Sequence, residues 1–317
     1  MAEMRFELYG TDSQLYEIKE LISYELVRDA DAPCDGLRLS FYTDSSLGEI
    51  DRVFAYRGDK KVFFGYADTQ REEYGENGYR AFIYARSAAC LLVDNEAEPG
   101  EYNSPTARAM YLINAKPLGF KFSLTDYSAR GSYLVQKGTS CYAAINDLVS
   151  FSAGRNITVT SDMKITLADG SGAFCIDRES VISERRVISR GDVISRLDCK
   201  LYDADGYRYH MQSRRFTDTG IKRSKKLNLS SFPEWQRSST LKRMLKESAR
   251  GYMLFKITVS GAGGGAIYDI AEYESDRFGR LEGYYISSIC TSFDKNGEKT
   301  VYTLTKETEL KEITYVD

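Results

Sequence analysis

The sequence of 317 residues has little of what most enzymes and membrane proteins need. It contains one histidine, His210, and no GxSxG or comparable nucleophile motif, so the usual parts of a Ser-His-Asp or Cys-His site are missing. Its longest apolar runs, such as residues 88–93, are far shorter than the roughly 20 residues of a membrane-spanning helix. The first ten residues lack the basic-then-apolar pattern of a secretory signal. We therefore expect neither an enzyme nor a membrane partner.

Cysteine and proline are also sparse. The six cysteines are scattered without a CxxC pair, which argues against a zinc cluster and against a small disulfide scaffold. Reduced, mostly buried thiols in a protein made in the cytoplasm are expected. Five prolines and 25 glycines argue against disorder. We expect a folded chain that needs no metal and no cofactor.

Tyrosine and charge stand out among the residues that are present. The chain has 24 tyrosines and is 42% apolar, a composition that favours strands and allows a sizeable core. The net charge is −3, but residues 178–250 contain 18 Lys and Arg against nine Asp and Glu, a net of +9, so the remainder carries −12. This asymmetry predicts either a basic face that docks on an acidic neighbour or a well-solvated insertion.

The first β region extends to about residue 86. Residues 37–42, 53–56, 62–66 and 79–84 read as strands separated by Gly/Asn/Asp turns, which is the pattern of hairpins. Residues 15–27 fit a helix by apolar spacing and a strand by composition, and we favour the strand. Residues 87–93 are expected to form a short helix.

A small α+β module is expected next. Ser104 and Pro105 predict the N-cap and first position of a helix that ends before Pro117. A strand at 120–124 follows, and a second helix begins at Thr139 or Ser140. Gly154 is its expected C-cap, and a hairpin follows at 157–167.

The remainder returns to β structure. Strands are expected at 193–201, 207–211, 252–259, 267–273, 284–291 and 300–305, with a helix at 238–250. We expect a mainly β chain with an α+β insert: residues 1–93 form one β-barrel domain, 94–174 the small α+β module, and 175–317 a second β-barrel domain with a basic loop and helix inserted at 208–250.

A possible internal repeat supports the two β domains. Gly65-Tyr66 is followed after 12 residues by an Asn-Gly turn and the strand YRAFIYA, and Gly283-Tyr284 after 13 residues by an Asn-Gly turn and EKTVYTL. Self-similarity of this kind predicts a duplicated unit.

Three motifs admit a functional interpretation. The glycines at 261–265 lack the Lys-Ser/Thr of a phosphate-binding loop and are expected to form a flexible hairpin tip. Asp203 to Gly206 lacks the other ligands of a calcium loop and reads as a β-turn. The segment YLVQKGT, 133–139, resembles the opening of a lysin motif, a peptidoglycan-binding module, although a structural insert of similar shape is preferred.

The segment from Gly65 to Tyr102, with LLVDNEAEP at 91–99, resembles the baseplate hub proteins of contractile phage tails and phage-tail-like particles, the late control D-like family. The resemblance implies two tail-tube-like β domains per chain. It implies a homotrimer that forms a pseudo-hexameric ring, with a hexameric tail tube on one side and a trimeric spike on the other. It carries no catalytic residues, and it implies a place in the baseplate of a virion or of a bacteriocin particle.

The resemblance also gives the basic stretch a role. Six residues are candidates for contact with a neighbouring subunit or the tube protein: Arg214, Arg215, Lys222, Arg223, Lys225 and Lys226. Alternatively, they line the lumen and touch passing DNA or the tape measure protein. The alternative for the whole chain is a tail module that binds or cleaves peptidoglycan.

Overall fold

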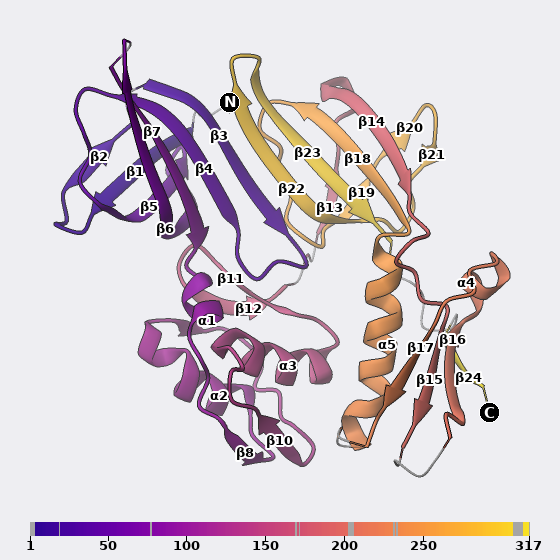
Figure 1. Cartoon of the computed structure of the whole chain (residues 1–317). Helices are drawn as coiled ribbons and strands as arrows, with labels where there is room; N and C mark the ends of the chain where they lie inside the picture. Colours follow the sequence, from indigo (N-terminus) through magenta and orange to yellow (C-terminus); the bar gives the residue numbers. More distant parts are fainter. Residues whose placement is uncertain are drawn as a thin grey trace.

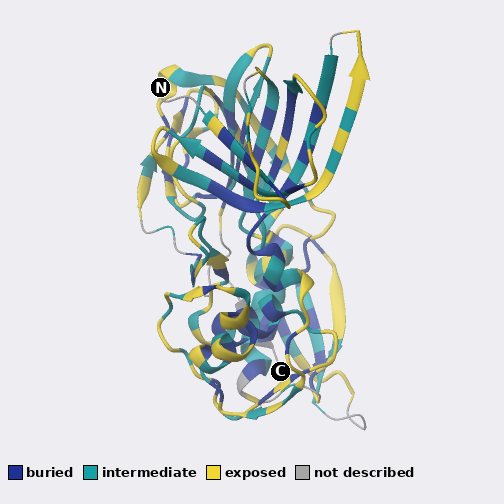
Figure 2. Ribbon diagram, turned by 90° about the vertical axis from the view of Figure 1, so that its left-hand side faces the viewer, coloured by how far each residue is buried: buried dark blue, intermediate teal, exposed yellow. Residues whose placement is uncertain are grey.

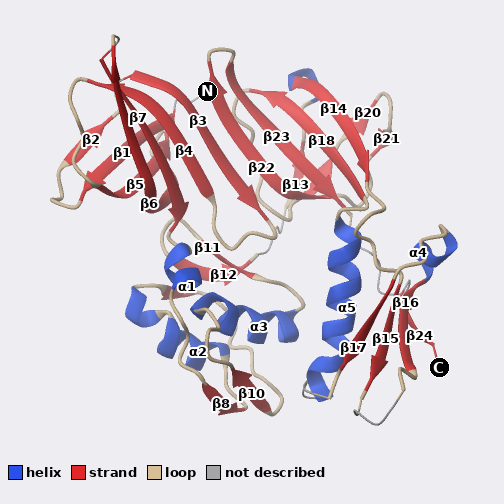
Figure 3. Cartoon of the chain, in the orientation of Figure 1, coloured by secondary structure: helices blue, strands red, loops and turns tan. Residues whose placement is uncertain are grey.

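The computed structural model describes residues 4–18, 20–76, 78–168, 170, 172–201, 206–230, 232, 234–306 and 313–316. Its largest feature is a 13-stranded sheet that extends across the upper layer of the molecule (Figure 1). The helices lie below this layer, with three smaller strand groups beside them (Figure 3). The expected mainly β fold with α+β structure is confirmed.

The first β unit comprises seven strands in the order β2-β1-β5-β6-β7-β4-β3. Their bounds are β1 Met4–Gly10, β2 Leu15–Glu17, β3 Glu20–Asp29, β4 Gly36–Thr43, β5 Ile50–Arg57, β6 Lys60–Gly75 and β7 Gly78–Ser87. The strand favoured at 15–27 is therefore confirmed, as β2 and β3. The unit curls around an apolar core in which side chains such as Leu8, Leu39 and Phe63 are almost wholly buried.

The second β unit comes after residue 172. Its strands are β13 Ala173–Cys175, β14 Val181–Ile188, β18 Met253–Ser260, β19 Ile270–Glu272, β20 Glu274–Ser275, β21 Gly279–Arg280, β22 Tyr285–Asp294 and β23 Gly297–Thr305. A 3-10 turn, Arg178–Ser180, precedes β14. The unit has its own core, which includes Ile257, Ile286 and Tyr302.

The two β units have the same strand order, and their strand directions agree at every pairing except one: β13 is parallel to β19, whereas β1 is antiparallel to β5. In chain order, β1, β3, β4, β5, β6 and β7 correspond to β13, β14, β18, β19, β22 and β23. The sheet order of the first set is β1-β5-β6-β7-β4-β3 and that of the second is β13-β19-β22-β23-β18-β14. The matching orders identify an internal duplication at the level of structure.

Residue-level register supports the duplication. When the turn glycines Gly78 and Gly297 are matched, the pairings of β6 with β7 and of β22 with β23 have a bulge at the same place, between Ala67 and Thr69 and between Ile286 and Ser288. A second matched bulge lies in β3, after Leu21, and in β14, after Val181. Bulges alter twist and strand direction, so two shared bulges are stronger evidence than shared strand order alone.

The buried positions of the paired strands coincide as well. Ala81, Ile83 and Ala85 of β7 face the first core, and their matches Thr300, Tyr302 and Leu304 of β23 face the second. In this register, Gly65 of the first unit is equivalent to Tyr284 of the second unit and not to Gly283. The Gly-Tyr pairs noticed in the sequence are therefore offset by one residue, although the hairpins that they open are equivalent.

The α+β module, residues 88–168, follows the first β unit. It contains α1 Cys90–Asp94, β8 Gly100–Asn103, α2 Ala107–Asn114, the 3-10 turn Lys116–Leu118, β9 Lys121–Phe122, β10 Ser132–Val135, α3 Cys141–Ala153, β11 Ile157–Val159 and β12 Lys164–Leu167. The predicted caps of α3 are confirmed: the Ser140 hydroxyl accepts from the Ala143 amide, and Gly154 is left-handed at φ 71°.

The predicted start of α2 is wrong by two residues. Its N-cap is Thr106, whose hydroxyl accepts a hydrogen bond of 3.1 Å from the amide of Ala109. Ser104 has a φ of 48°, in the left-handed region, and Pro105 lies before the helix. Threonine is also a favourable N-cap residue, so Thr106 can accept a hydrogen bond from a free amide of the first turn in place of Ser104. The Ser-Pro pattern does not show which of the two residues caps the helix.

The helix–sheet module is inserted between β14 and β18. It contains β15 Arg196–Lys200, β16 Tyr209–Ser213, α4 Arg214–Asp218, β17 Ser224–Asn228 and α5 Glu234–Arg250, and its sheet is completed by β24 Ile313–Val316 in the order β17-β15-β16-β24. The strand expected at 193–201 thus pairs within this module and not with the second β unit. Leu241 and Leu245 of α5 are buried against it, as expected. Most of the turn predicted at Asp203–Gly206 lies outside the described residues, and the predicted domain boundaries stay a prediction.

Candidate functional site: the seam between the β units and the surrounding surfaces

The two β units share one sheet because β3 of the first pairs with β22 of the second. Six antiparallel pairs extend from Tyr24 opposite Phe293 to Asp29 opposite Ser288. The rings of Tyr24 and Phe293 are stacked with centroids 6.2 Å apart. The backbone carbonyl of Arg28 also accepts a hydrogen bond of 3.0 Å from the Ser288 hydroxyl. This junction, which we call the seam, fixes the two units side by side (Figure 1).

A polar cluster closes one end of the seam. The Arg57 guanidinium, at the end of β5, lies 2.8 Å from the Glu298 carboxylate on β23, and the Tyr24 hydroxyl donates to the same carboxylate. Burial, and then the hydrogen bond to Glu298, raise the pKa of Tyr24. Burial acts to raise the pKa of Glu298, but the hydrogen bonds from Arg57 and Tyr24 outweigh it and hold that pKa below its usual value. The cluster therefore links the two units through a half-buried charge pair.

The predicted basic residues do not form one uniform patch. Arg214 is exposed on α4 and lies 3.7 Å from Asp218, whereas the Arg215 guanidinium lies over the Phe216 ring at 5.7 Å and the Tyr252 ring at 5.9 Å. The guanidinium of Arg223 donates to the carbonyl of Arg190. Arg215 thus takes part in packing, whereas Arg223 is exposed and makes one internal hydrogen bond.

The three lysines of the basic stretch are the more accessible members. Lys222 is exposed in the loop before β17. Lys225 and Lys226 are exposed on β17, which pairs only with β15 among the described residues, and the Lys226 ammonium lies 5.2 Å from the Tyr207 ring. With Arg214 and Arg223, these lysines make five exposed cations that a neighbour could contact. Their role stays a prediction.

A second basic region lies where the α+β module meets α5. A cleft of 970 Å³ is lined by residues of α3, α5 and the second β unit. Two acids, Glu247 and Glu282, line it together with six cations: Arg155, Lys242, Arg243, Lys246, Arg250 and Lys306. Four of these cations lie on α5, at the end of the basic segment 178–250, whereas Arg155 and Lys306 come from distant parts of the chain, so the sequence showed the charge but not the cleft.

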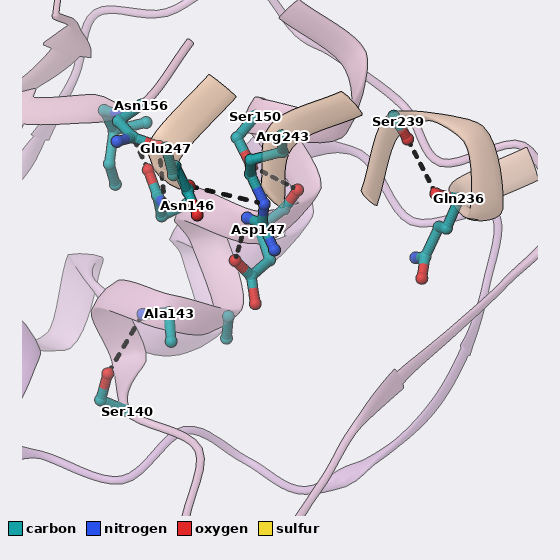
Figure 4. Close-up of polar contacts among 12 residues, drawn as sticks. Ser140, Ala143, Asn146, Asp147, Ser150, Asn156, Gln236, Ser239, Arg243 and Glu247 are labelled. Carbon is teal, nitrogen blue, oxygen red and sulfur yellow. Dashed lines mark hydrogen bonds and ion pairs between the residues drawn. The ribbon is translucent and has the colours of Figure 1, made fainter. Parts of the chain in front are cut away.

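Arg243 joins α5 to α3 at this cleft (Figure 4). Its guanidinium lies 3.4 Å from the Asp147 carboxylate, 3.8 Å from Glu247 and 5.2 Å from the centre of the Phe151 ring. Burial raises the pKa of Asp147, against the attraction of Arg243. On the same helix, Asn146 binds the chain beyond α3: its side-chain oxygen accepts from the Ile157 amide at 2.9 Å. The contacts hold the two lower modules together.

The single histidine occupies a cross-strand pair. His210 on β16 lies directly opposite Asp198 on β15, with its Nδ1 2.6 Å from the carboxylate, and Arg196 contacts both side chains. Burial acts to raise the pKa of Asp198, but the hydrogen bonds from Arg196 and His210 outweigh it and lower that pKa. His210 is thus a hydrogen-bonded strand residue, as expected. Among the described residues, no group of three His, Cys, Asp or Glu side chains is placed to hold a metal ion.

Two motif interpretations are settled by geometry. The glycine segment 261–265 is not a hairpin tip, because β18 and β19 do not pair with each other. It packs against Tyr302, whose hydroxyl donates to the Gly264 carbonyl at 3.0 Å, and a Cβ on Gly263 would lie 1.9 Å from that hydroxyl. Close approach, and not flexibility, explains these glycines.

The lysin-like segment forms β10, and α3 follows it. β10 pairs with β8 upstream, whereas β11 and β12 pair with each other and with β9. The strand after the helix therefore does not close on β10, and the segment is part of a differently connected module. Within the described residues, no helix is both long and apolar enough to cross a membrane.

Comparisons with known proteins agree with this architecture. No family model and no curated protein sequence matches the chain. Among solved structures, the 43 kDa tail protein of prophage MuSo2 from Shewanella oneidensis matches with a TM-score of 0.76 at 15% identity, over 95% of this chain and 98% of that protein. A tail protein from Neisseria meningitidis MC58 matches with a TM-score of 0.73 at 14% identity, over 96% of each chain.

A third match widens the group to secretion machines. It is an E. coli component of the type VI secretion system described as similar to the bacteriophage T4 tail proteins gp27 and gp5, with a TM-score of 0.58, 9% identity, and 96% of this chain and 77% of that protein covered. The matches extend over nearly the whole chain, so both β units and both lower modules are shared features. The chain has the fold of the phage and prophage tail proteins that it resembles.

Proposed function

We propose that the chain is a structural baseplate hub, three copies of which form an adaptor between a hexameric tail tube and a trimeric spike. The supporting observation is the duplicated β unit: one chain holds two units of matching strand order edge to edge. Three such chains supply six similar units in a ring, while the assembly as a whole keeps threefold symmetry. Units of this kind fit a sixfold neighbour on one side and a threefold neighbour on the other.

The lower modules fit the same role. The α+β module and the helix–sheet module hang below the sheet layer and differ from each other, so they repeat three times and not six in such a ring (Figure 2). A threefold spike requires contacts that repeat three times. The proposed location is therefore the baseplate of a virion or headless particle, with tube, spike and other baseplate proteins as partners and no catalytic role.

The oligomeric state tests this proposal. We expect light scattering coupled to size exclusion to give the mass of a trimer for the purified chain at high concentration. A stable dimer or hexamer, or a monomer at every concentration, contradicts the proposal. Release of sugar fragments from purified cell walls by the chain, measured in parallel, would favour the wall-cleaving alternative instead.

The exposed basic residues are proposed to meet an acidic surface on the tube protein or on another hub subunit. Single exposed ion pairs contribute about 0–1 kcal/mol, so a cluster acts mainly on association rate and register. Reversing Arg214, Lys222, Lys225 and Lys226 to Glu should leave the melting temperature within a few degrees and reduce the number of assembled particles in negative-stain images. Arg215 and Arg223 are left intact because each makes a contact within the chain, Arg215 with the Tyr252 ring and Arg223 with the Arg190 carbonyl. Normal particle numbers with failed delivery would instead assign these side chains to the lumen.

A further inference from the structure

Two strand edges of the sheet have no strand beside them among the described residues. β14 begins the sheet and pairs only with β18. β6 pairs with β5 from Lys60 to Tyr66, but beyond Tyr66 only β7 accompanies it. Figure 2 shows the far part of this hairpin as an exposed arm that stands out from the sheet. Open edges of this kind are prone to pair with another chain.

The duplication indicates which strand would pair with each open edge. β14 corresponds to β3, and the far part of β6 corresponds to the part of β22 that β3 covers in the seam. Within the chain, β3 and β22 pair with each other, so neither has an open edge at the seam. The equivalent pair, β14 and β6, lies toward opposite ends of the same sheet (Figure 1) and so cannot meet within one chain.

We propose that residues 184–189 of β14 and its following residue pair antiparallel with residues 69–74 of β6 in a second copy of this chain, in the register of the seam. This inference rests on the proposed trimer and specifies its contact. In the seam, Tyr24 lies opposite Phe293 and Asp29 lies opposite Ser288. Glu184 and Ser189 of β14 are equivalent to Tyr24 and Asp29, and Tyr74 and Thr69 of β6 are equivalent to Phe293 and Ser288. The proposed contact therefore pairs Glu184 with Tyr74 and Ser189 with Thr69.

Charge supports this register. The two central positions bring Arg185 opposite Glu73 and Arg186 opposite Glu72, so both pairs are of opposite sign. Within the single chain, the Glu72 carboxylate already accepts hydrogen bonds from the Leu47 amide and the Ser46 hydroxyl, and Arg186 lies over the Phe278 ring, so the charge argument depends mainly on Arg185 and Glu73. Opposite charges directly across an antiparallel pair stabilise it, and like charges destabilise it. A shift of one residue in one direction would place Arg185 opposite Glu72 but Arg186 opposite Arg71. The seam register thus avoids the facing arginines.

The backbone of β14 is oriented for such a contact. The Ser189 amide donates to the Tyr252 carbonyl on the β18 side at 2.9 Å. Since successive residues of a strand alternate in direction, the N–H and C=O groups of Glu184, Arg186 and Ile188 point to the open edge. The same parity holds in the seam, where the Ala30 amide donates to the Ser287 carbonyl at 2.8 Å.

Exposed apolar groups lie along the same edges. Ile188 is 50% exposed and Tyr74 is 76% exposed in the single chain. Because the donor edge and the acceptor edge are different strands, the contact is heterologous and propagates around a ring until it closes. In the proposed ring, the same antiparallel strand contact joins the two β units within each chain and joins each chain to its neighbour.

Disulfide trapping tests the register. In a Cys175→Ser background, which removes an exposed thiol, Glu73→Cys with Arg185→Cys should give covalent species up to a trimer on a non-reducing gel. The matched control, Arg71→Cys with Arg185→Cys, places the thiols on diagonal neighbours about 7–8 Å apart, beyond the usual reach of a disulfide. Equal trapping of both pairs, or trapping of the control alone, overturns the register.

A proline tests the edge itself. Ile188→Pro removes an N–H that faces the open edge and spares the β14–β18 ladder, whereas the control Ile188→Thr keeps that N–H. We expect the proline variant to raise the trimer dissociation constant at least tenfold and the threonine variant to change it less than threefold. A trimer that tolerates the proline and fails to cross-link refutes the seam-like contact but leaves the hub proposal standing, whereas a monomer at every concentration refutes both.

Discussion

The two β units share strand order and two bulges, yet they differ in what their hairpins carry. In the first unit, β3 and β4 are joined by the short stretch 30–35, and in the second the equivalent strands β14 and β18 are separated by the whole helix–sheet module. The edge of β6 beyond Tyr66 is open, whereas the matching edge of β22 is covered by β3. A duplicated unit can therefore accept a module at a turn while its core positions stay unchanged.

Truncation of equivalent core residues in the two β units should have the largest effect and tests whether the units are equivalent in stability. Leu39 of β4 and Ile257 of β18 occupy the same register position, and each is 1% exposed. Replacing either by alanine should lower the free energy of unfolding by about 2–5 kcal/mol. Because the units share one sheet, we expect each variant to shift a single denaturant transition seen by both fluorescence and circular dichroism.

The exposed Leu15 of β2 provides the control for these truncations. Leu15→Ala should change the free energy of unfolding by less than about 0.5 kcal/mol, because Leu15 is 42% exposed and lies outside the buried core. Two separate transitions, with only one displaced by each core variant, would show that the units unfold independently and that the seam does not couple them.

Removal of the charge pair across the seam should have an intermediate effect. Glu298→Gln weakens the contacts with Arg57 and Tyr24 and should cost about 1–2 kcal/mol, reduced from the value of a fully buried pair because both side chains are about a fifth exposed. The Glu298 pKa is lowered in the folded state, so its contribution is present above the unfolded pKa and is lost as the pH falls.

A double-mutant cycle isolates that contribution. Arg57→Met, Glu298→Gln and the double variant, compared in urea at neutral pH and at about pH 3, should show coupling only at neutral pH. Coupling of the same size at both pH values would mean that charge pairing is not what joins the units at this point.

The smallest expected effect concerns the short turn that distinguishes the first unit. Burial raises the pKa of Asp35 to about 6, while Arg28, 3.8 Å away, opposes the shift. A carboxyl whose pKa is raised on folding binds its proton more tightly in the folded state, so its contribution to stability falls as the pH rises from about 4 to about 6. Asp35→Asn should therefore gain stability relative to the unmodified chain across this interval. Parallel urea midpoints at every pH would contradict the assignment.

Much of the fold could be predicted from local patterns. Alternating apolar residues and Asn-Gly turns gave the hairpins of both units, and Ser140 with Gly154 gave the limits of α3. The open edges could not be found in this way, because whether a strand has a neighbour depends on segments far apart in the chain. Their only signal in the sequence was the repeated hairpin, which becomes informative once the bulges fix its register.

The candidate functional residues were predicted less well. The basic run at 214–226 was visible as a run, but Arg215 and Arg223 are occupied by internal contacts that no spacing rule indicates. The cations around Arg243 belong mostly to α5 and were counted in the basic segment 178–250, but their gathering at one cleft with Arg155 and Lys306 depends on the tertiary fold. Glu72, Glu73, Arg185 and Arg186 belong to no motif, and only the duplication places them opposite one another.

The most direct test of the account is a reconstruction of the purified assembly by electron cryomicroscopy. It predicts a threefold ring of six similar β lobes, in which β14 of each chain continues the sheet of the next chain through the far part of β6, and the two lower modules appear three times each. A closed ring without those strand contacts would contradict the edge pairing, and a particle with any symmetry other than threefold would contradict the hub itself.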